Sequence, residues 1–198
     1  MSYWQAQESA RFTLEIKKSR FIALACPCTT RAQAMVFLEQ AKSEFPDARH
    51  HCWAYVLGDP DNAASMASSD DGEPGGTAGR PILSVLQHKN IGDLMLVVVR
   101  YFGGIKLGAG GLVRAYGQAA DGVTQELKLS KPVHMQHWQA TCDFAHEQFL
   151  RHWLEQHGGQ VLEVSYGSSV CLQLQLPDAV EAEENEQLAA RGIELKAV

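Results

Sequence analysis

Hydrophobic and polar residues follow two different periods along the chain, and each period predicts a different kind of element. Residues 11–17 alternate with a period of two, and residues 20–28 form a nearly continuous apolar run, so both are predicted strands. Apolar residues recur at helical spacing over 31–45, after candidate N-caps at Thr29 and Thr30, which predicts a helix. By the same criteria, further strands are predicted at 51–57 and 94–102, and further helices at 81–88 and 112–127.

A long segment between two of these elements is predicted to be a loop. Residues 58–80 are rich in Gly, Asp, Ser and Pro, which favour turns over regular structure. Loops longer than about 15 residues inside a compact domain are usually functional or disordered. The run Gly72–Gly79 needs special backbone geometry, so we expect this part of the loop to be ordered.

The last third of the chain has a pattern of its own. Its elements are expected in the order βαββαβ, at 134–142, 145–157, 160–166, 169–176, 179–190 and 192–198. This order predicts a ferredoxin-like domain with two helices covering one face of the sheet. Lys131-Pro132 is the predicted boundary, so we expect an α+β protein with domains at 1–130 and 131–198.

Charge is unevenly distributed over these two parts. The chain of 198 residues has a formal net charge of −6, yet residues 1–128 hold 13 basic and 13 acidic residues and are neutral. The acidic excess lies in the last third, and no acidic residue occurs between Asp93 and Asp121. A local positive patch can therefore form in the first part, because electrostatic potential depends on nearby charges.

Composition also bears on the compartment. With 45% hydrophobic and 20% charged residues, the chain is typical of globular proteins. No apolar run approaches the ~20 residues that cross a bilayer, and the N-terminal residues lack a signal-peptide pattern. The five cysteines suggest no disulfide framework. We therefore expect a cytoplasmic protein without membrane contact.

The acid-free stretch contains residues 100–114, which we call the glycine loop. It joins a predicted strand to a predicted helix and combines five glycines with three cations. Successive backbone N–H groups, and those that begin a helix, bind anions such as phosphate or sulfate. The spacing matches no nucleotide-binding motif, and a tight structural joint is the alternative. The predicted anion- or nucleic-acid-binding residues are Arg100, Gly103, Gly104, Lys106, Gly108, Gly110, Gly111 and Arg114.

Residues 69–81 form an electrostatic opposite, which we call the acidic loop. Asp70, Asp71 and Glu73 place three carboxylates within four residues, with Thr77 close behind. Such a cluster can bind Mg²⁺, contact a partner, or pair with the cations of the glycine loop. Structural pairing is the favoured alternative, and no metal site or cofactor is expected because the spacing is not that of an EF-hand.

Two further motifs carry less information. Arg49-His50-His51 precedes a strand with Trp53 and Tyr55, a basic and aromatic mixture that also occurs on nucleic-acid-binding surfaces. Ordinary alternation between surface and core is the favoured interpretation. Cys26-Pro-Cys28 could supply two zinc ligands, but no matching Cys or His pair follows to complete a structural site.

The two loops together resemble the signature of the IMPACT family. Residues 70–81 and 100–116 carry the resemblance, which spans about residues 10–125, and the remainder is similar to the C-terminal domain of bacterial members. The resemblance implies an N-terminal domain like the second domain of a small-subunit ribosomal protein. It also implies a C-terminal domain similar to domain V of elongation factor G.

The resemblance links the chain to translation and its regulation in stress responses. We therefore expect a non-enzymatic protein that contacts RNA or ribosome-associated factors through the glycine loop. An enzyme is the alternative: Asp70, Asp71 or Glu73 would act as base or Mg²⁺ ligand, and Lys106 and Arg114 would clamp a phosphorylated or carboxylated ligand. A protein–protein regulator is a third possibility, for which an apolar patch would be expected.

Overall fold

The computed structural model divides the chain into two compact units, Met1–Pro132 and Val133–Val198. Residues 3–131, 135–177 and 182–198 are described. The division falls beside Lys131-Pro132, and both units combine helices with largely antiparallel sheets, so the predicted α+β class is confirmed. Within the described ranges, no helix is long and apolar enough to cross a membrane.

A five-stranded sheet with the order β2-β3-β7-β4-β5 forms the centre of the first unit, and all its neighbouring strands are antiparallel. The strands are β2 (Ala10–Ile16), β3 (Ser19–Pro27), β4 (His50–Leu57), β5 (Ser65–Ser69) and β7 (Leu94–Tyr101). The four strands predicted for this part of the chain are therefore confirmed, with ends displaced by about one residue, as is usual for such boundaries.

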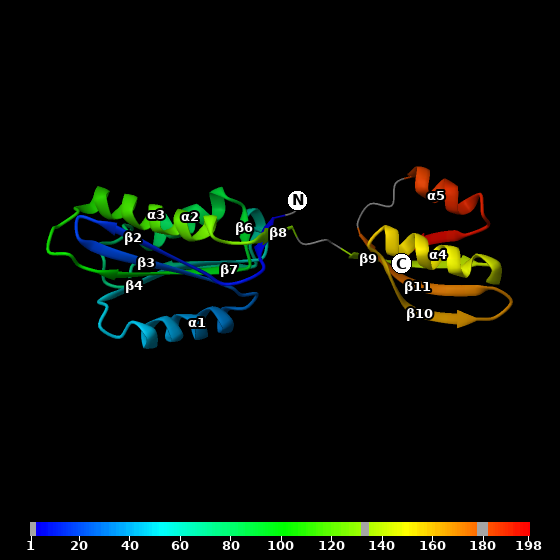
Figure 1. Cartoon of the computed structure of the whole chain (residues 1–198), viewed down its shortest axis with the longest axis horizontal. Coiled ribbons are helices and arrows are strands. Elements are labelled where there is room, and N and C mark those ends of the chain that lie inside the picture. The colour runs from blue at the N-terminus through cyan, green and yellow to red at the C-terminus, as the bar shows by residue number, and fades with distance from the viewer. Residues whose placement is uncertain (1–2, 132–134, 178–181) are drawn as a thin grey trace. The chain divides into compact units, whose positions relative to one another are not determined.

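Helices cover both faces of this sheet (Figure 1). One face carries α1 (Arg31–Glu44), and the other carries α2 (Gly79–His88) and α3 (Ala109–Gln125). Strand β7 lies in the middle and is buried on both sides, which explains its continuous apolar sequence. Alternate residues of β7 enter the two cores: Leu94, Leu96 and Val98 on the α2–α3 side, Met95, Val97 and Val99 on the α1 side.

Several elements of the first unit differ from the prediction. The predicted loop contains the edge strand β5 and a short 3₁₀ turn at Pro60–Asn62. Strand β5 is a short, polar edge strand that pairs only with β4. Its sequence therefore shows no alternation of apolar and polar residues from which a strand could be predicted. A small second sheet with the order β6-β1-β8 was not predicted either. Its strands are too short for any period: β1 (Trp4–Ala6), β6 (Ile91–Gly92) and β8 (Leu129–Ser130).

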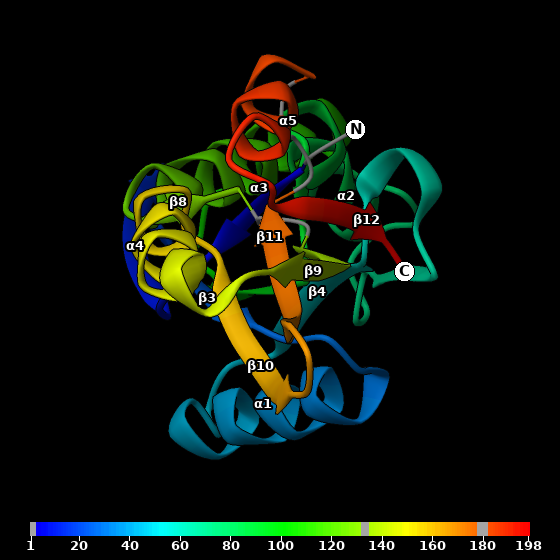
Figure 2. The ribbon, with the colours of Figure 1, turned by 90° about the vertical axis from the view of Figure 1, so that its right-hand side faces the viewer.

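The second unit confirms the predicted βαββαβ order, with its strands arranged as β10-β11-β9-β12 in one antiparallel sheet (Figure 2). Leu150 and Leu154 of α4 and Leu188 of α5 share one core with the sheet. The predicted helix over 179–190 begins outside the described residues, as does the strand start at 134. The observed bounds are β9 (Met135–Cys142), α4 (Glu147–Gln156), β10 (Gln160–Tyr166), β11 (Val170–Pro177), α5 (Ala182–Ala189) and β12 (Glu194–Ala197).

Candidate functional site

The glycine loop runs from the end of β7 into the first turn of α3. Helix α3 begins at Ala109, three residues earlier than predicted, and its N-cap is Gly108 with a φ of 71°. This left-handed conformation suits glycine and leaves the cap position without a side chain. No side chain caps the helix, and within the described ranges the N–H groups of residues 109–111 have no hydrogen-bond partner. These N–H groups therefore remain free to bind an anion.

Gly103 has a structural role in the same loop. A Cβ atom at this position would lie 1.9 Å from the backbone carbon of Lys18, which no side chain can tolerate. The Gly103 N–H also donates to Ser19 Oγ at 3.1 Å. Gly103 thus ties the loop to the β2–β3 turn. Gly104 lies beyond it in the exposed part of the loop, while Gly110 and Gly111 lie in the first turn of α3.

Asp70 of the acidic loop acts as a cap for α2. Its Oδ1 accepts from the N–H groups of Ala78 at 2.9 Å and Gly79 at 2.8 Å, and its Oδ2 accepts from Gly76 at 2.7 Å. Burial by itself would raise the pKa of Asp70, but these three hydrogen bonds outweigh it and hold the pKa below its ordinary value. The carboxylate is therefore committed to the backbone.

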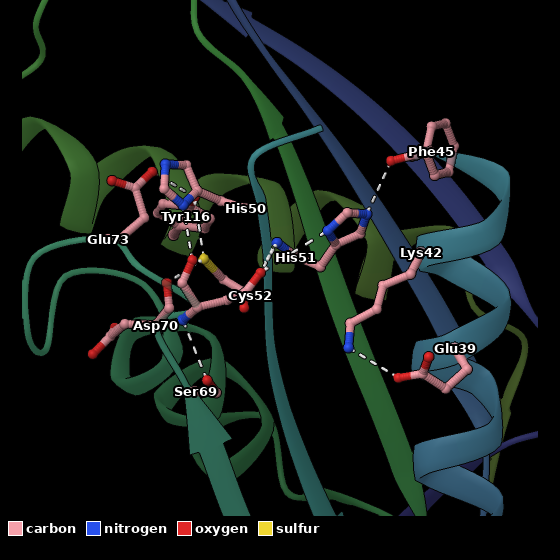
Figure 3. A network of polar contacts seen from close by, with 11 residues as sticks. Glu39, Lys42, Phe45, His50, His51, Cys52, Ser69, Asp70, Glu73 and Tyr116 are labelled. Carbon is pink, nitrogen blue, oxygen red and sulfur yellow. Dashed lines mark hydrogen bonds and ion pairs between the residues drawn. The ribbon is translucent and has the colours of Figure 1, made fainter. Parts of the chain in front are cut away.

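The other polar groups of the acidic loop are also satisfied internally. Asp71 Oδ2 accepts from the backbone N–H of His51 at 2.6 Å, and His50 Nδ1 donates to the Asp71 carbonyl at 2.8 Å. The Thr77 hydroxyl donates to the carbonyl of Pro74 at 2.6 Å. His51 itself is buried and donates from Nε2 to the carbonyl of Phe45 (Figure 3). These contacts fix the loop against β4.

Glu73 and Arg100 join the two loops by a buried ion pair. Arg100 Nη1 lies 2.5 Å from Glu73 Oε1, and the two side chains are only 8% and 4% exposed. The hydroxyl of Tyr116, on α3, donates to the same oxygen at 2.8 Å. Burial, reinforced by the neighbouring Cys52 and Glu73, raises the pKa of Tyr116, so the phenol keeps the proton that it donates. Figure 3 shows Tyr116 beside Cys52, whose Sγ lies 3.3 Å from the hydroxyl.

A pocket of about 310 Å³ lies where the two loops meet. This volume is at the lower end of the roughly 300–1,000 Å³ typical of small-ligand sites. The loops contribute Glu73, Pro74, Lys106, Leu107, Gly108 and Ala109. The glycine loop also contributes Arg100, Phe102 and Leu112, and Arg49 and His50 at the start of β4 complete the lining. Of the predicted site residues, the structure thus brings Glu73, Arg100, Lys106 and Gly108 together around one cavity.

Other predicted site residues lie outside the wall of this pocket. Asp70, Asp71 and Thr77 hold the acidic loop together, and Gly103 anchors the glycine loop. Arg114 is exposed on the first turns of α3. Gly104, Gly110 and Gly111 shape the loop and the helix start without lining the cavity.

Free positive charge surrounds the pocket. Lys106, Arg49 and Arg114 are all exposed, and none forms an ion pair with any residue that the structure describes. Because Arg100 offsets Glu73, the pocket wall keeps two uncompensated cations, Arg49 and Lys106. The cations of the glycine loop are therefore not neutralised as a group by the acidic loop, since Arg100 alone has a carboxylate partner.

Sequence reasoning left several pocket residues out of the site. Phe102 is 55% exposed, which is unusual for a large apolar side chain that lines a cavity. Arg49 and His50 reach the pocket although ordinary alternation was the favoured interpretation of their motif. The mixture of basic and aromatic residues near the start of β4 was the available signal. Leu107 and Leu112 gave no signal, because apolar residues next to glycines are common.

A carboxylate metal site is not formed by the acidic loop. In the part of the chain that the structure describes, no three His, Cys, Asp or Glu side chains are placed to hold a metal ion. Asp70 and Asp71 face backbone N–H groups, and Glu73 faces Arg100, so their charges are already used. The enzyme alternative therefore loses Asp70 and Asp71 as base or Mg²⁺ ligands.

The Cys26-Pro-Cys28 motif does not favour zinc either. Cys28 is buried, which raises its pKa to about 12 and disfavours the thiolate that zinc requires.

Fold and site together define a two-domain α+β protein with a cation-rich pocket between an acidic and a glycine-rich loop. The model of the Impact N-terminal domain matches residues 17–124, and that of a domain of unknown function (DUF1949) matches residues 141–191. The chain therefore belongs to the IMPACT family.

Individual relatives cover nearly the whole chain. IMPACT family member YigZ of Escherichia coli is 40% identical over 88% of this chain and 86% of its own length. An IMPACT family member of Haemophilus influenzae is also 40% identical, over 93% of this chain and 90% of its own length. A crystal structure described as that of a hypothetical protein has 36% identity and a TM-score of 0.66, and the match covers 100% of this chain and 97% of that one.

Proposed function

We propose that this protein is a non-enzymatic RNA-binding protein that acts on the translation apparatus in the cytoplasm. The observation that carries the proposal is the unpaired positive charge around the glycine loop. Lys106, Arg114 and Arg49 are exposed beside a helix start whose first N–H groups are free. Phosphate groups are bound by this combination of cations and helix N–H groups.

An exposed aromatic ring next to these cations favours nucleic acid over a simple anion. Phe102 extends from the end of β7 and lines the pocket together with Lys106. Proteins that bind single-stranded nucleic acids combine a positive surface with aromatic side chains on which bases stack. The overall charge of −6 does not oppose this, because the acidic excess lies in the second unit.

The fold adds weaker support for a role in translation. The βαββαβ order and the strand order β10-β11-β9-β12 are those of a ferredoxin-like domain. We infer a similarity of this unit to domain V of elongation factor G, and of the first unit to the second domain of a small-subunit ribosomal protein. Fold alone implies no function, so the assignment depends on the glycine loop. RNA or ribosome-associated factors are the proposed partners.

The direct test measures binding of a single-stranded RNA to the full chain at low and high salt. Phosphate contacts predict steep weakening as salt rises, and Lys106→Ala/Arg114→Ala should flatten the slope of log affinity against log salt by about one to two. Arg31→Ala is the matched control, because Arg31 is an exposed cation at the start of α1. An RNA affinity that does not fall as salt rises, or that is unchanged in the double variant, contradicts the proposal.

One observation favours an enzyme as a second candidate. Glu73 is a buried carboxylate in the pocket wall, and its Oε2 accepts no hydrogen bond from the described residues. A carboxylate oxygen without a partner in a ligand-sized cavity can act as a general base. This candidate predicts a thermal shift with a nucleotide, followed by turnover of that nucleotide. A shift without a product supports the binding function instead.

A further inference from the structure

The pocket presents three kinds of recognition surface within one cavity. One end is cationic, with Lys106 next to Gly108 and Ala109 at the uncapped start of α3. One wall is apolar, with Phe102, Leu107 and Leu112. The third part is the buried pair of Glu73 and Arg100. A ligand that satisfies all three must carry an anionic group, a flat or apolar body and a hydrogen-bond donor.

The cationic end is suited to a phosphate. The free N–H groups at the start of α3 point out of the helix end, and the helix dipole favours negative charge there. Lys106 adds a full charge with no carboxylate partner inside the described ranges. A second cation, Arg49, also lines the cavity. A single phosphate can therefore meet charge and N–H donors together.

The apolar wall is suited to a base. Phe102 is 55% exposed, and the Arg100 guanidinium lies over its ring, 5.7 Å from the centroid. A base would stack on the part of the ring that Arg100 leaves exposed. Leu107 and Leu112 lie on the same cavity and offer an apolar surface for a flat ring. Every nucleobase has two apolar faces, so any of the four bases can stack on an aromatic side chain.

The buried pair gives the pocket a specific polar contact. Glu73 Oε1 already accepts from Arg100 and Tyr116, but Oε2 has no partner among the residues described. Arg100, which is 7% exposed, also has an unpartnered atom, its buried Nε. A carboxylate oxygen accepts only, so the ligand must present a donor to it. In a nucleotide this donor is the 2′-hydroxyl, an exocyclic amino group, or the ring N–H of guanine or uracil.

We propose that this pocket holds one unstacked nucleotide of a single-stranded RNA. Its phosphate lies at the start of α3 beside Lys106, its base stacks on Phe102, and a donor group of the nucleotide meets Glu73. This inference rests on the proposed RNA-binding function and specifies where and how a nucleotide is held. Single-stranded RNA is commonly recognised through bases that leave the stack in this way.

The test compares stacking and competition at constant salt. The full chain is titrated into a fluorescent single-stranded RNA of about ten nucleotides, a typical site length for such proteins. Phe102→Ala should weaken binding about tenfold or more, the loss expected from removing one stacked base. Phe144→Ala is the matched control, because Phe144 is 57% exposed in the second unit. The four nucleoside 5′-monophosphates should displace the RNA from the unaltered chain.

Chemical variants of the RNA identify the donor without changing the protein. If the 2′-hydroxyl donates to Glu73, then DNA and 2′-O-methyl RNA of the same sequence bind more weakly than RNA. If an exocyclic amino group donates, then oligo-U binds more weakly than oligo-A or oligo-C, because uracil has no such group. If the ring N–H of uracil donates, then oligo-U binds more tightly than oligo-A or oligo-C, whose bases have no ring N–H.

Two outcomes overturn the inference, and they differ in what else they overturn. If Phe102→Ala binds as the Phe144→Ala control does and the monophosphates do not compete, the pocket holds no nucleotide. Salt-dependent binding through Lys106 and Arg114 then still supports the proposed function. If the unaltered chain binds no RNA at all, the proposed function and the nucleotide pocket fail together.

Discussion

The acidic loop and the glycine loop lie side by side around one pocket, yet they use their charged groups in opposite ways. Asp70 and Asp71 of the acidic loop bond to backbone N–H groups within the fold. Lys106 and Arg114 of the glycine loop are exposed and form no ion pair in the described parts of the chain. One loop is held by its charges, whereas the other presents them to solvent.

This difference shows why a cluster of charges in a sequence does not identify a binding site by itself. A carboxylate can be required by the backbone, because the N–H groups at a helix start need an acceptor. The fold does not require an exposed cation in this way, because an exposed cation contributes little to stability. Glu73 and Arg100 belong to both groups: they form a buried ion pair within the fold, and they also line the pocket.

The largest expected effect comes from removing one member of this buried pair. Glu73→Gln leaves the charge of Arg100 without compensation in the interior, which should destabilise the first unit by about 3–5 kcal/mol. Hydrogen exchange of peptides from β7 and α3 measures the loss, because these elements carry Arg100 and Tyr116. Peptides from β11, in the second unit, serve as an internal reference.

A paired substitution separates the ion pair from the shape of the site. Glu73→Met/Arg100→Met removes both charges and keeps apolar volume, so it should recover much of the stability lost in Glu73→Gln. If the amide hydrogens of β7 and α3 exchange at the same rate in Glu73→Gln as in the unaltered chain, this ion pair does not join the two loops. The comparison between them would then lose its structural basis.

A smaller effect is expected from the helix cap in the acidic loop. Asp70→Asn replaces the carboxylate that accepts from the N–H groups of Ala78 and Gly79 by a neutral amide. This change should lower the free energy of unfolding by about 1–2 kcal/mol. The folded-state pKa of Asp70 lies below its ordinary value, so its stabilising effect is fully present above about pH 4. The effect is lost as the pH falls further, through the folded-state pKa.

Thermal unfolding as a function of pH tests this prediction. The unaltered chain should be more stable than Asp70→Asn at neutral pH, and the difference should shrink toward zero in acid. Asp47→Asn is the matched control, because Asp47 is exposed. A difference that stays constant with pH contradicts the prediction, because it means that the stability lost in Asp70→Asn does not come from the ionised carboxylate.

Much of this fold could be predicted from the sequence, and the exceptions have physical causes. Strand β7 was predicted because burial on both faces requires apolar residues at every position. Edge strand β5 was missed because it is polar, short and stabilised mainly by its pairing with β4. The start of α2 was placed two residues late, because its cap, Asp70, lies nine residues before Gly79 and is invisible to local capping rules.

The candidate site was predictable to a lesser degree. Glycines and cations identified the glycine loop, but sequence could not separate Gly103, which fits against Lys18, from glycines that shape an exposed surface. Pairing between the loops was expected as a group, whereas the structure restricts the direct ion pair to Glu73 and Arg100. Which carboxylate reaches which cation depends on the register of strands far apart in the chain, and no local pattern records it.

The smallest expected effect on stability is the most informative for the comparison. Lys106→Ala/Arg114→Ala should change the free energy of unfolding by less than about 0.5 kcal/mol, because both side chains are exposed and without carboxylate partners among the described residues. Urea unfolding followed by circular dichroism, beside Arg31→Ala, measures this change. A loss as large as that of Asp70→Asn would mean that the glycine loop also uses its cations for the fold. An unchanged stability combined with lost RNA binding assigns these two cations to a ligand, because a residue that does not stabilise the fold but is needed for binding acts on the partner.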